Sequence, residues 1–157
     1  MSSELLVAIC GVIATLVSPF VVLWFQQQRE NSSLSFISKN RRSSLTTKEW
    51  VGTVTPDSHV SQEPFAIKAK FICKGKVVSS FITYQGDKGE EIQINLKGGF
   101  YDNRFLKLDY ADNDPCIIQF GIMLFELNAE ANLLAGRYLG YGRQSQKINS
   151  GEIVLQK

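Results

Sequence analysis

Cationic and aromatic side chains are interleaved in the C-terminal half of this chain. Arginine binds phosphate through two parallel hydrogen bonds, and aromatic rings stack on nucleobases, so this mixture is typical of a site for a nucleotide-sized anion. We select as candidate ligand-binding residues Tyr84, Tyr101, Arg104, Lys107, Arg137, Tyr138, Tyr141 and Arg143. Lys147, Phe100 and Tyr110 lie among them. The alternative is that the aromatic residues fill a core while the cations only solvate a face.

Patterns that would support catalysis or a metal site are missing from the sequence. The single histidine, His59, has no HExxH or HxH spacing around it. Glu90 and Glu91 are adjacent on a predicted strand, so their side chains point to opposite faces. The Asp-Asn-Asp stretch 112–114 lacks the glycine and glutamate of a calcium loop and predicts a turn, and the glycine-rich stretch 136–142 lacks the lysine of a phosphate-binding loop. We therefore expect no enzymatic activity, no metal and no cofactor.

Length and composition set the class of protein. The chain has 157 residues with 12 glycines, 4 prolines and 3 cysteines, which favours one folded domain and excludes a collagen-like repeat or a disulfide scaffold. A net charge of only +2 argues against a partner that is a nucleic-acid polymer, because such binders carry a clustered basic patch. The charges are unevenly placed: residues 5–25 carry none, and every Lys and Arg follows them.

Residues 5–25 predict a transmembrane helix. A helix of this length spans about 30 Å, the thickness of the hydrocarbon core of a bilayer. The landmarks of the span are Leu5 at its start, Gly11 as a small residue for helix contact, Pro19 as a kink, and Trp24 and Phe25 at the interface. The alternatives are a cleaved signal peptide, which needs a basic start and small residues at the cut site, and a buried core helix.

The basic residues predict the orientation of this span. Five of them follow it closely and none precedes it, which places the C-terminal part in the cytoplasm. They are Arg29, Lys39, Arg41, Arg42 and Lys48. The two cysteines outside the span, Cys73 and Cys116, show no CxxC spacing, as is usual in a reducing compartment.

We divide the chain into a transmembrane helix (1–28), a basic and polar linker (29–48) and a strand-rich domain (49–157). After Trp50 the hydrophobic pattern has a period of two, as in Ile67, Ala69 and Phe71 between Lys68 and Lys70. The expected strands cover residues 50–55, 65–71, 77–84, 92–96, 104–110, 116–127, 133–141 and 151–155. We expect the pair of glycines at 98 and 99 to end the fourth strand.

These strands are joined mostly by short turns, and parallel pairing needs crossovers of a dozen or more residues, so we expect antiparallel neighbours. About eight such strands suit a small closed β-barrel or a sandwich. We favour an all-β fold: an eight-stranded antiparallel barrel, with Trp50 closing one end, preceded by one transmembrane helix.

Short motifs in the last third of the chain resemble a known family. They are Gln-Phe-Gly at 119–121, Leu-Ala-Gly-Arg-Tyr-Leu-Gly-Tyr at 134–141 and Ile-Asn-Ser-Gly-Glu-Ile-Val-Leu-Gln-Lys at 148–157, together with Trp50-x-Gly52. They resemble the final and first strands of the transmembrane β-barrel effectors of bacterial antiphage signalling, which occur in CBASS and Panoptes systems. That family typically has two membrane helices, whereas this chain has room for one.

The resemblance implies an antiphage receptor in the bacterial inner membrane, with its barrel in the cytoplasm. The barrel would bind a cyclic di- or oligonucleotide made by a partner nucleotidyltransferase. The nucleotide would control homo-oligomerisation and membrane disruption, either by activating the effector or, in a Panoptes-like circuit, by holding it off. Two other classes remain open from the residues: a membrane-anchored, lipocalin-like barrel for a lipid or another apolar ligand, and a tethered scaffold for protein partners.

Overall fold

The computed structural model describes residues 34–57, 63–86, 89–112, 114, 116–142 and 145–157, together with Pro19, Val21 and Val22. The chain divides into two compact units, Met1–Ser33 and Leu34–Lys157. In the first unit, Pro19, Val21 and Val22 have helical backbone. The other landmarks of the predicted span lie outside the described residues: Leu5, Gly11, Trp24 and Phe25. Within the described part of the chain, no helix has the length and apolar character needed to cross a membrane.

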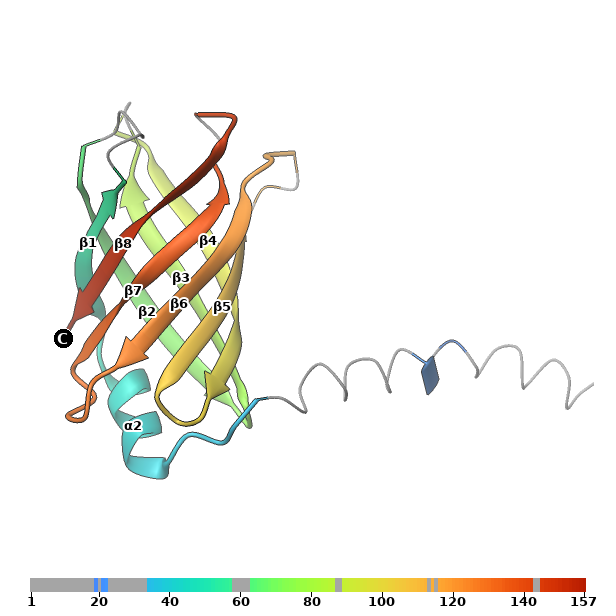
Figure 1. Cartoon of the computed structure of the whole chain (residues 1–157), viewed down its shortest axis with the longest axis vertical. Helices are drawn as coiled ribbons and strands as arrows, with labels where there is room; N and C mark the ends of the chain where they lie inside the picture. The colour runs from blue at the N-terminus through green and yellow to red at the C-terminus, as the bar shows by residue number, and fades with distance from the viewer. Residues whose placement is uncertain are drawn as a thin grey trace, which may run out of the picture. The chain divides into compact units, whose positions relative to one another are not determined.

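The second unit is an eight-stranded antiparallel β-barrel, as predicted (Figure 1). Each strand pairs with its neighbours in the sequence, and β1 pairs with β8 to close the barrel. Closure leaves no free edge strand, which removes a common site of aggregation. The strands are β1 (Trp50–Pro56), β2 (Phe65–Lys74), β3 (Val77–Gln85), β4 (Glu91–Tyr101), β5 (Phe105–Asp112), β6 (Phe120–Leu127), β7 (Leu133–Tyr141) and β8 (Ile148–Gln156).

The predicted alternation decides which side chains fill the barrel. On β2, Ile67, Ala69 and Phe71 are buried while Lys68 and Lys70 are exposed. The same period runs through the other strands, because successive side chains point to opposite faces of a sheet. The interior is almost wholly apolar, and Ser80 is the one buried polar residue in the described part of the chain.

A short helix, α2 (Lys39–Thr47), covers one end of the barrel (Figure 1). Leu45 is its one buried residue, and its backbone oxygen accepts a hydrogen bond from Trp50 Nε1 at 3.0 Å. Upstream of α2, Ser35 forms an isolated bridge with Phe100 of β4. The predicted linker 29–48 therefore does not separate the barrel from the upstream chain along its whole length. Its residues from 34 onward belong to the barrel unit.

Several strand boundaries differ from the sequence prediction, and the two largest differences are at the end of β4 and the start of β6. The glycines at 98 and 99 do not end β4. Gly98 pairs with Val78 and Leu108, and a Cβ there would overlap the backbone oxygen of Lys107, so the glycine permits close strand pairing rather than a break. The strand predicted from residue 116 begins at Phe120 instead. Before it, Asp114 Oδ1 accepts a hydrogen bond from the backbone N–H of Cys116, which holds that segment in a turn.

The barrel thus has two different ends. The end covered by α2, here called the helix end, is filled by fully buried large side chains: Trp50, Phe71, Phe100 and Phe125. At the opposite end, here called the loop end, the chain connects β1 to β2, β3 to β4, β5 to β6 and β7 to β8.

Candidate functional site

Three tyrosines point inward near the loop end of the barrel. Tyr84 of β3 is paired with the buried Ile67 and Ile92, and Tyr138 of β7 follows the inward parity of the buried Leu134. The third, Tyr110 of β5, is buried on the same side as Leu106 and Leu108. We call Tyr84, Tyr110 and Tyr138 the tyrosine cluster. The ring of Phe65 packs against Tyr84, with ring centroids 5.2 Å apart, and extends the aromatic lining.

The ring of Tyr110 packs against glycines, among them Gly140 of β7. A Cβ at Gly140 would overlap the Tyr110 hydroxyl, so the absence of a side chain makes room for the ring. Burial, followed by the neighbouring Tyr138 and Tyr84, raises the pKa of Tyr110 to about 12. Burial, and then the nearby carboxylate of Asp57, also raise the pKa of Tyr138. Both phenols are therefore neutral hydrogen-bond donors at physiological pH.

This shift predicts a loss of stability at high pH. The pKa of Tyr110 is about 12 in the folded protein but 10 in the unfolded chain. Its contribution to stability is therefore fully present below pH 10 and is lost as the pH rises from 10 towards about 12, because the unfolded chain releases its proton first. We expect the free energy of unfolding to fall over this interval, and to fall less in Tyr110→Phe. Denaturant titrations at several pH values measure it. An equal pH dependence in both proteins would show that Tyr110 does not carry the effect.

Asp112 and Gln119, both partly buried residues next to the cluster, each have one side-chain oxygen that is shielded from solvent and has no hydrogen-bond partner: Asp112 Oδ2 and Gln119 Oε1. The other oxygen of Asp112, Oδ1, accepts from the backbone N–H of Asp114 at 2.9 Å. The backbone N–H of Asp112 donates to the backbone oxygen of Gln119 at 3.0 Å, which continues the β5–β6 pairing beyond Tyr110 and Gly121. Asp112 is opposite the buried Ile94 of β4 and so shares the inward parity of Tyr110. A buried acceptor without a donor is unfavourable, so these two atoms are suited to accept from a bound group.

Arg137 lies beside the cluster but on the outer wall. It precedes Tyr138 on β7, so the two side chains point to opposite faces of the sheet. Its guanidinium binds both carboxylate oxygens of Asp57, at 2.8 and 2.7 Å, and the Ser150 hydroxyl donates to the same carboxylate. Arg137 is therefore an ion-pair partner of Asp57, and Asp57 in turn influences the phenol of Tyr138.

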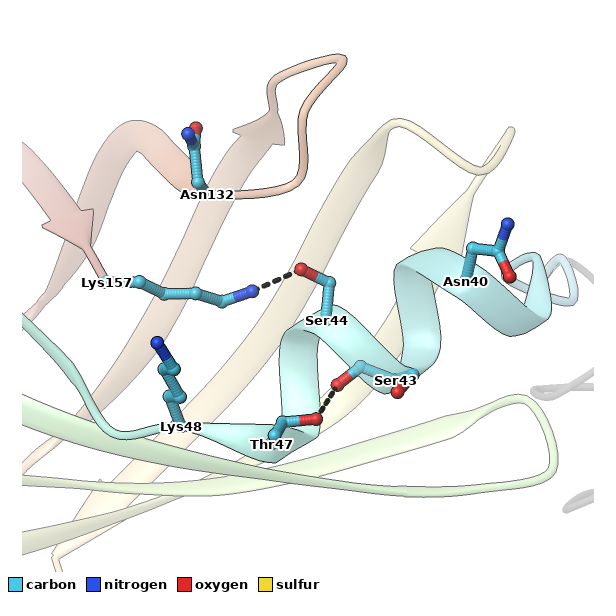
Figure 2. A pocket seen from close by; sticks show the side chains of 7 residues that line it. All are labelled: Asn40, Ser43, Ser44, Thr47, Lys48, Asn132 and Lys157. Atoms are coloured by element: carbon cyan, nitrogen blue, oxygen red, sulfur yellow. Dashed lines mark hydrogen bonds between the residues drawn. The ribbon is translucent and has the colours of Figure 1, made fainter.

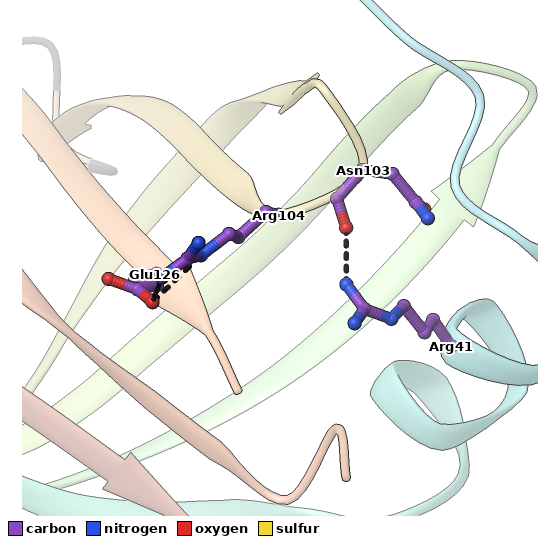
Figure 3. A network of polar contacts seen from close by, with 4 residues as sticks. All are labelled: Arg41, Asn103, Arg104 and Glu126. Atoms are coloured by element: carbon purple, nitrogen blue, oxygen red, sulfur yellow. Dashed lines mark hydrogen bonds and ion pairs between the residues drawn. The ribbon is translucent and has the colours of Figure 1, made fainter. Parts of the chain in front are cut away.

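The remaining candidates that the structure describes do not join the tyrosine cluster. Arg104 lies at the helix end and pairs with Glu126, close to where Arg41 of α2 donates to the backbone oxygen of Asn103 (Figure 3). Lys107 is on the outer wall and forms an ion pair with Asp109 at 3.3 Å. Tyr101 and Tyr141 also point outward, the latter stacked on Phe120 with ring centroids 6.0 Å apart.

The candidate residues that the structure describes thus lie in different parts of the barrel. Only Tyr84 and Tyr138 come together inside the barrel, while Arg143 and His59 lie outside the described residues. Tyr110, Asp112 and Gln119 were not among the candidates, although strand parity could have identified Tyr110. It is two residues beyond Leu108, on the apolar side of its strand, whereas Lys107 is on the polar side. Residue type alone does not reveal this parity.

Comparison with known proteins supports the fold. No protein-family model and no curated protein matches the sequence. Among solved structures, the chain is similar to EF1p2_mFAP2b bound to DFHBI, with a TM-score of 0.60 and 12% identity, over 76% of this chain and 99% of the other. It is also similar to a redesigned β-barrel, b11L5F_LGL, with a TM-score of 0.59 and 12% identity, over 74% of this chain and 94% of the other. At this identity the likeness establishes the barrel fold alone.

Proposed function

We propose that this chain is a membrane-anchored receptor whose barrel binds a cyclic di- or oligonucleotide at the tyrosine cluster. The observation that carries the proposal is the convergence of Tyr84, Tyr110 and Tyr138 inside the loop end. Each ring offers a flat apolar face and a polar tip, which is the combination that nucleobases and their phosphates require.

Each group of the site has a definite part in this binding. The half-buried rings of Tyr84 and Tyr138 stack on bases, and the neutral phenols of Tyr110 and Tyr138 donate to phosphate or carbonyl oxygens. Asp112 Oδ2 and Gln119 Oε1 accept from the N–H groups of a base. Arg137 takes no direct part, because it lies on the outer wall, and it orients Asp57 instead.

The output of the receptor follows from its predicted anchor. With residues 5–25 in the inner membrane and the barrel in the cytoplasm, binding of the nucleotide controls how many copies assemble and whether the membrane is disrupted. A single helix makes no pore by itself, so this output depends on assembly. The resemblance of residues 119–121, 134–141 and 148–157 to the antiphage effectors supports this part of the proposal.

An apolar surface on the outer wall supports the homo-oligomer. Large exposed side chains lie close together on three neighbouring strands, here called the β6–β8 face: Phe120, Ile122, Leu124, Leu139 and Ile148. Monomeric soluble proteins rarely expose a contiguous patch of this kind.

Ile122→Lys is expected to shift the full-length chain in detergent to a smaller assembly, measured by light scattering. Ile72→Lys is the matched control, because Ile72 is similarly exposed on β2. An unchanged mass for Ile122→Lys would exclude this face from the assembly.

A second function is favoured by the apolar interior, which is the lining that an apolar ligand prefers. The similarity to EF1p2_mFAP2b points in the same direction, since that barrel is bound to DFHBI. In this case the chain is an anchored, lipocalin-like carrier.

Thermal unfolding of the full-length chain in neutral detergent distinguishes the two functions. A cyclic dinucleotide at a hundred times its dissociation constant should stabilise the fold by about 2.7 kcal/mol, while fatty acids should have no effect. Stabilisation by fatty acids alone would favour the carrier. If no member of a panel of cyclic di- and trinucleotides changes the melting temperature, the receptor proposal fails.

A further inference from the structure

An open pocket of about 590 Å³ lies at the helix end of the barrel, between α2 and the end of β8 (Figure 2). Its lining offers hydroxyl, amide and ammonium groups but no carboxylate side chain. The lining residues are Asn40, Ser43, Ser44, Thr47, Lys48, Asn132 and Lys157. This pocket is at the opposite end of the barrel from the tyrosine cluster, and the proposed function does not use it.

The ammonium group of Lys157 is fixed in this pocket. It donates to Ser44 Oγ and to the backbone oxygen of Ala131, the latter at 2.8 Å. It also lies 4.8 Å from the centre of the Trp50 ring, whose face attracts a cation. These contacts hold the charge in one place without neutralising it, because none of its partners is an anion.

Lys48 supplies a second cation to the same space (Figure 2). Among the described residues it has neither a hydrogen-bond partner nor an ion-pair partner. Burial lowers the pKa of Lys157, and the like charge of Lys48 lowers it further. The nearby carboxylate of Glu130 accepts a hydrogen bond from the Asn132 amide at 2.9 Å. An anion between the two lysines would relieve their repulsion.

We propose that the Lys48–Lys157 pocket binds a phosphate group, and that its source is the headgroup of an anionic lipid. Lysine ammonium groups and hydroxyl donors are common ligands of phosphate in proteins. Phe25, the end of the predicted span, precedes Leu34 by nine residues, which cover about 30 Å at most when extended. With residues 5–25 in the bilayer, the barrel unit therefore begins within reach of the headgroups.

The test uses the full-length chain in neutral detergent. The substitution Trp24→Phe leaves Trp50 as the only tryptophan of the sequence, so the tryptophan emission reports on Trp50 alone. The chain is titrated with dihexanoyl phosphatidylglycerol, with its zwitterionic phosphatidylcholine counterpart and with inorganic phosphate. Because Lys157 lies on the Trp50 ring, an anion that binds the lysine should change the emission of Trp50, and calorimetry provides an independent reading. Lys48→Gln removes one cation, and Lys68→Gln, at an exposed position on β2, is the matched control.

We expect saturable binding of phosphatidylglycerol, at least tenfold weaker in Lys48→Gln and unchanged in Lys68→Gln. The phosphatidylcholine lipid should bind at least tenfold less tightly. If inorganic phosphate binds as tightly as phosphatidylglycerol, the lipid assignment is wrong and the pocket takes a free anion. If none of the three binds, or if both lysine variants weaken binding equally, the pocket proposal is overturned. None of these results tests the tyrosine cluster, which lies at the other end of the barrel.

Discussion

Replacing Trp50 with alanine is expected to lower the free energy of unfolding by about 3–5 kcal/mol. Trp50 is fully buried at the helix end, and its ring meets Phe71 edge to face, with centroids 5.9 Å apart and planes at 85°. Its indole N–H holds α2 through the backbone oxygen of Leu45, and its face carries Lys157. The substitution therefore creates a large cavity and also removes the hydrogen bond that joins α2 to the barrel.

Urea denaturation of the full-length chain in detergent measures this cost. Val51→Ala is the control, because Val51 is the next residue on β1 and is 48% exposed on the outer wall. It should cost less than about 1 kcal/mol. Backbone amides of residues 39–47 should also lose protection from hydrogen exchange in Trp50→Ala but not in Val51→Ala. Equal costs for the two substitutions would mean that Trp50 does not close the helix end.

If the barrel binds a cyclic nucleotide at the tyrosine cluster, as proposed, replacing Tyr138 with alanine is expected to weaken this binding by about fivefold to 150-fold. Stacking of one base on an aromatic side chain contributes about 1–3 kcal/mol, which corresponds to this range. Tyr138 is half-buried on the inward side of β7, and its pKa is raised, so it offers both a ring and a neutral donor. Tyr138→Phe should retain the stacking and lose only the part of the affinity that the hydroxyl contributes.

Tyr141→Ala is the matched control for this substitution. Tyr141 lies on the same strand, three residues further on, and stacks on Phe120 outside the barrel. Calorimetry on the full-length chain should therefore give an unchanged dissociation constant for Tyr141→Ala. A loss of affinity in Tyr141→Ala that equals the loss in Tyr138→Ala would move the site to the outer wall.

The strands were predictable because their hydrophobic residues recur with a period of two, and the same residues are the ones buried inside the barrel. On β2 the apolar residues Ile67 and Phe71 alternate with Lys68 and Lys70, and a one-residue slip would expose every apolar side chain. The short turns then required antiparallel neighbours. The helix α2 was not predictable in this way, because its sequence contains a single apolar residue, Leu45, and lacks an acidic first turn. Its contacts with Trp50 and the barrel stabilise it, since short helices are marginal on their own.

The site was less predictable than the fold, because the type of a residue does not show which face of the strand its side chain occupies. Arg137 and Tyr138 are adjacent and chemically suited to one ligand, yet the pleat sends them to opposite faces. Arg104 satisfies the same criterion of type, but the β4–β5 turn places it at the helix end with Glu126. Lys157 and Lys48 come together only because the chain closes β8 against β1 next to α2, which no local pattern indicates.

The five tyrosines of the chain provide the most direct test of the ligand site. Tyr84, Tyr110 and Tyr138 face inward, whereas Tyr101 and Tyr141 lie on the outer wall. The full-length chain, labelled with carbon-13 in its tyrosine rings, is examined by NMR in detergent during titration with a cyclic dinucleotide that stabilises it. The ring signals of the three inward tyrosines should shift in a saturable way while those of the two outer tyrosines stay in place. Shifts confined to Tyr101 and Tyr141, with the inward rings unchanged, would contradict a ligand site inside the barrel.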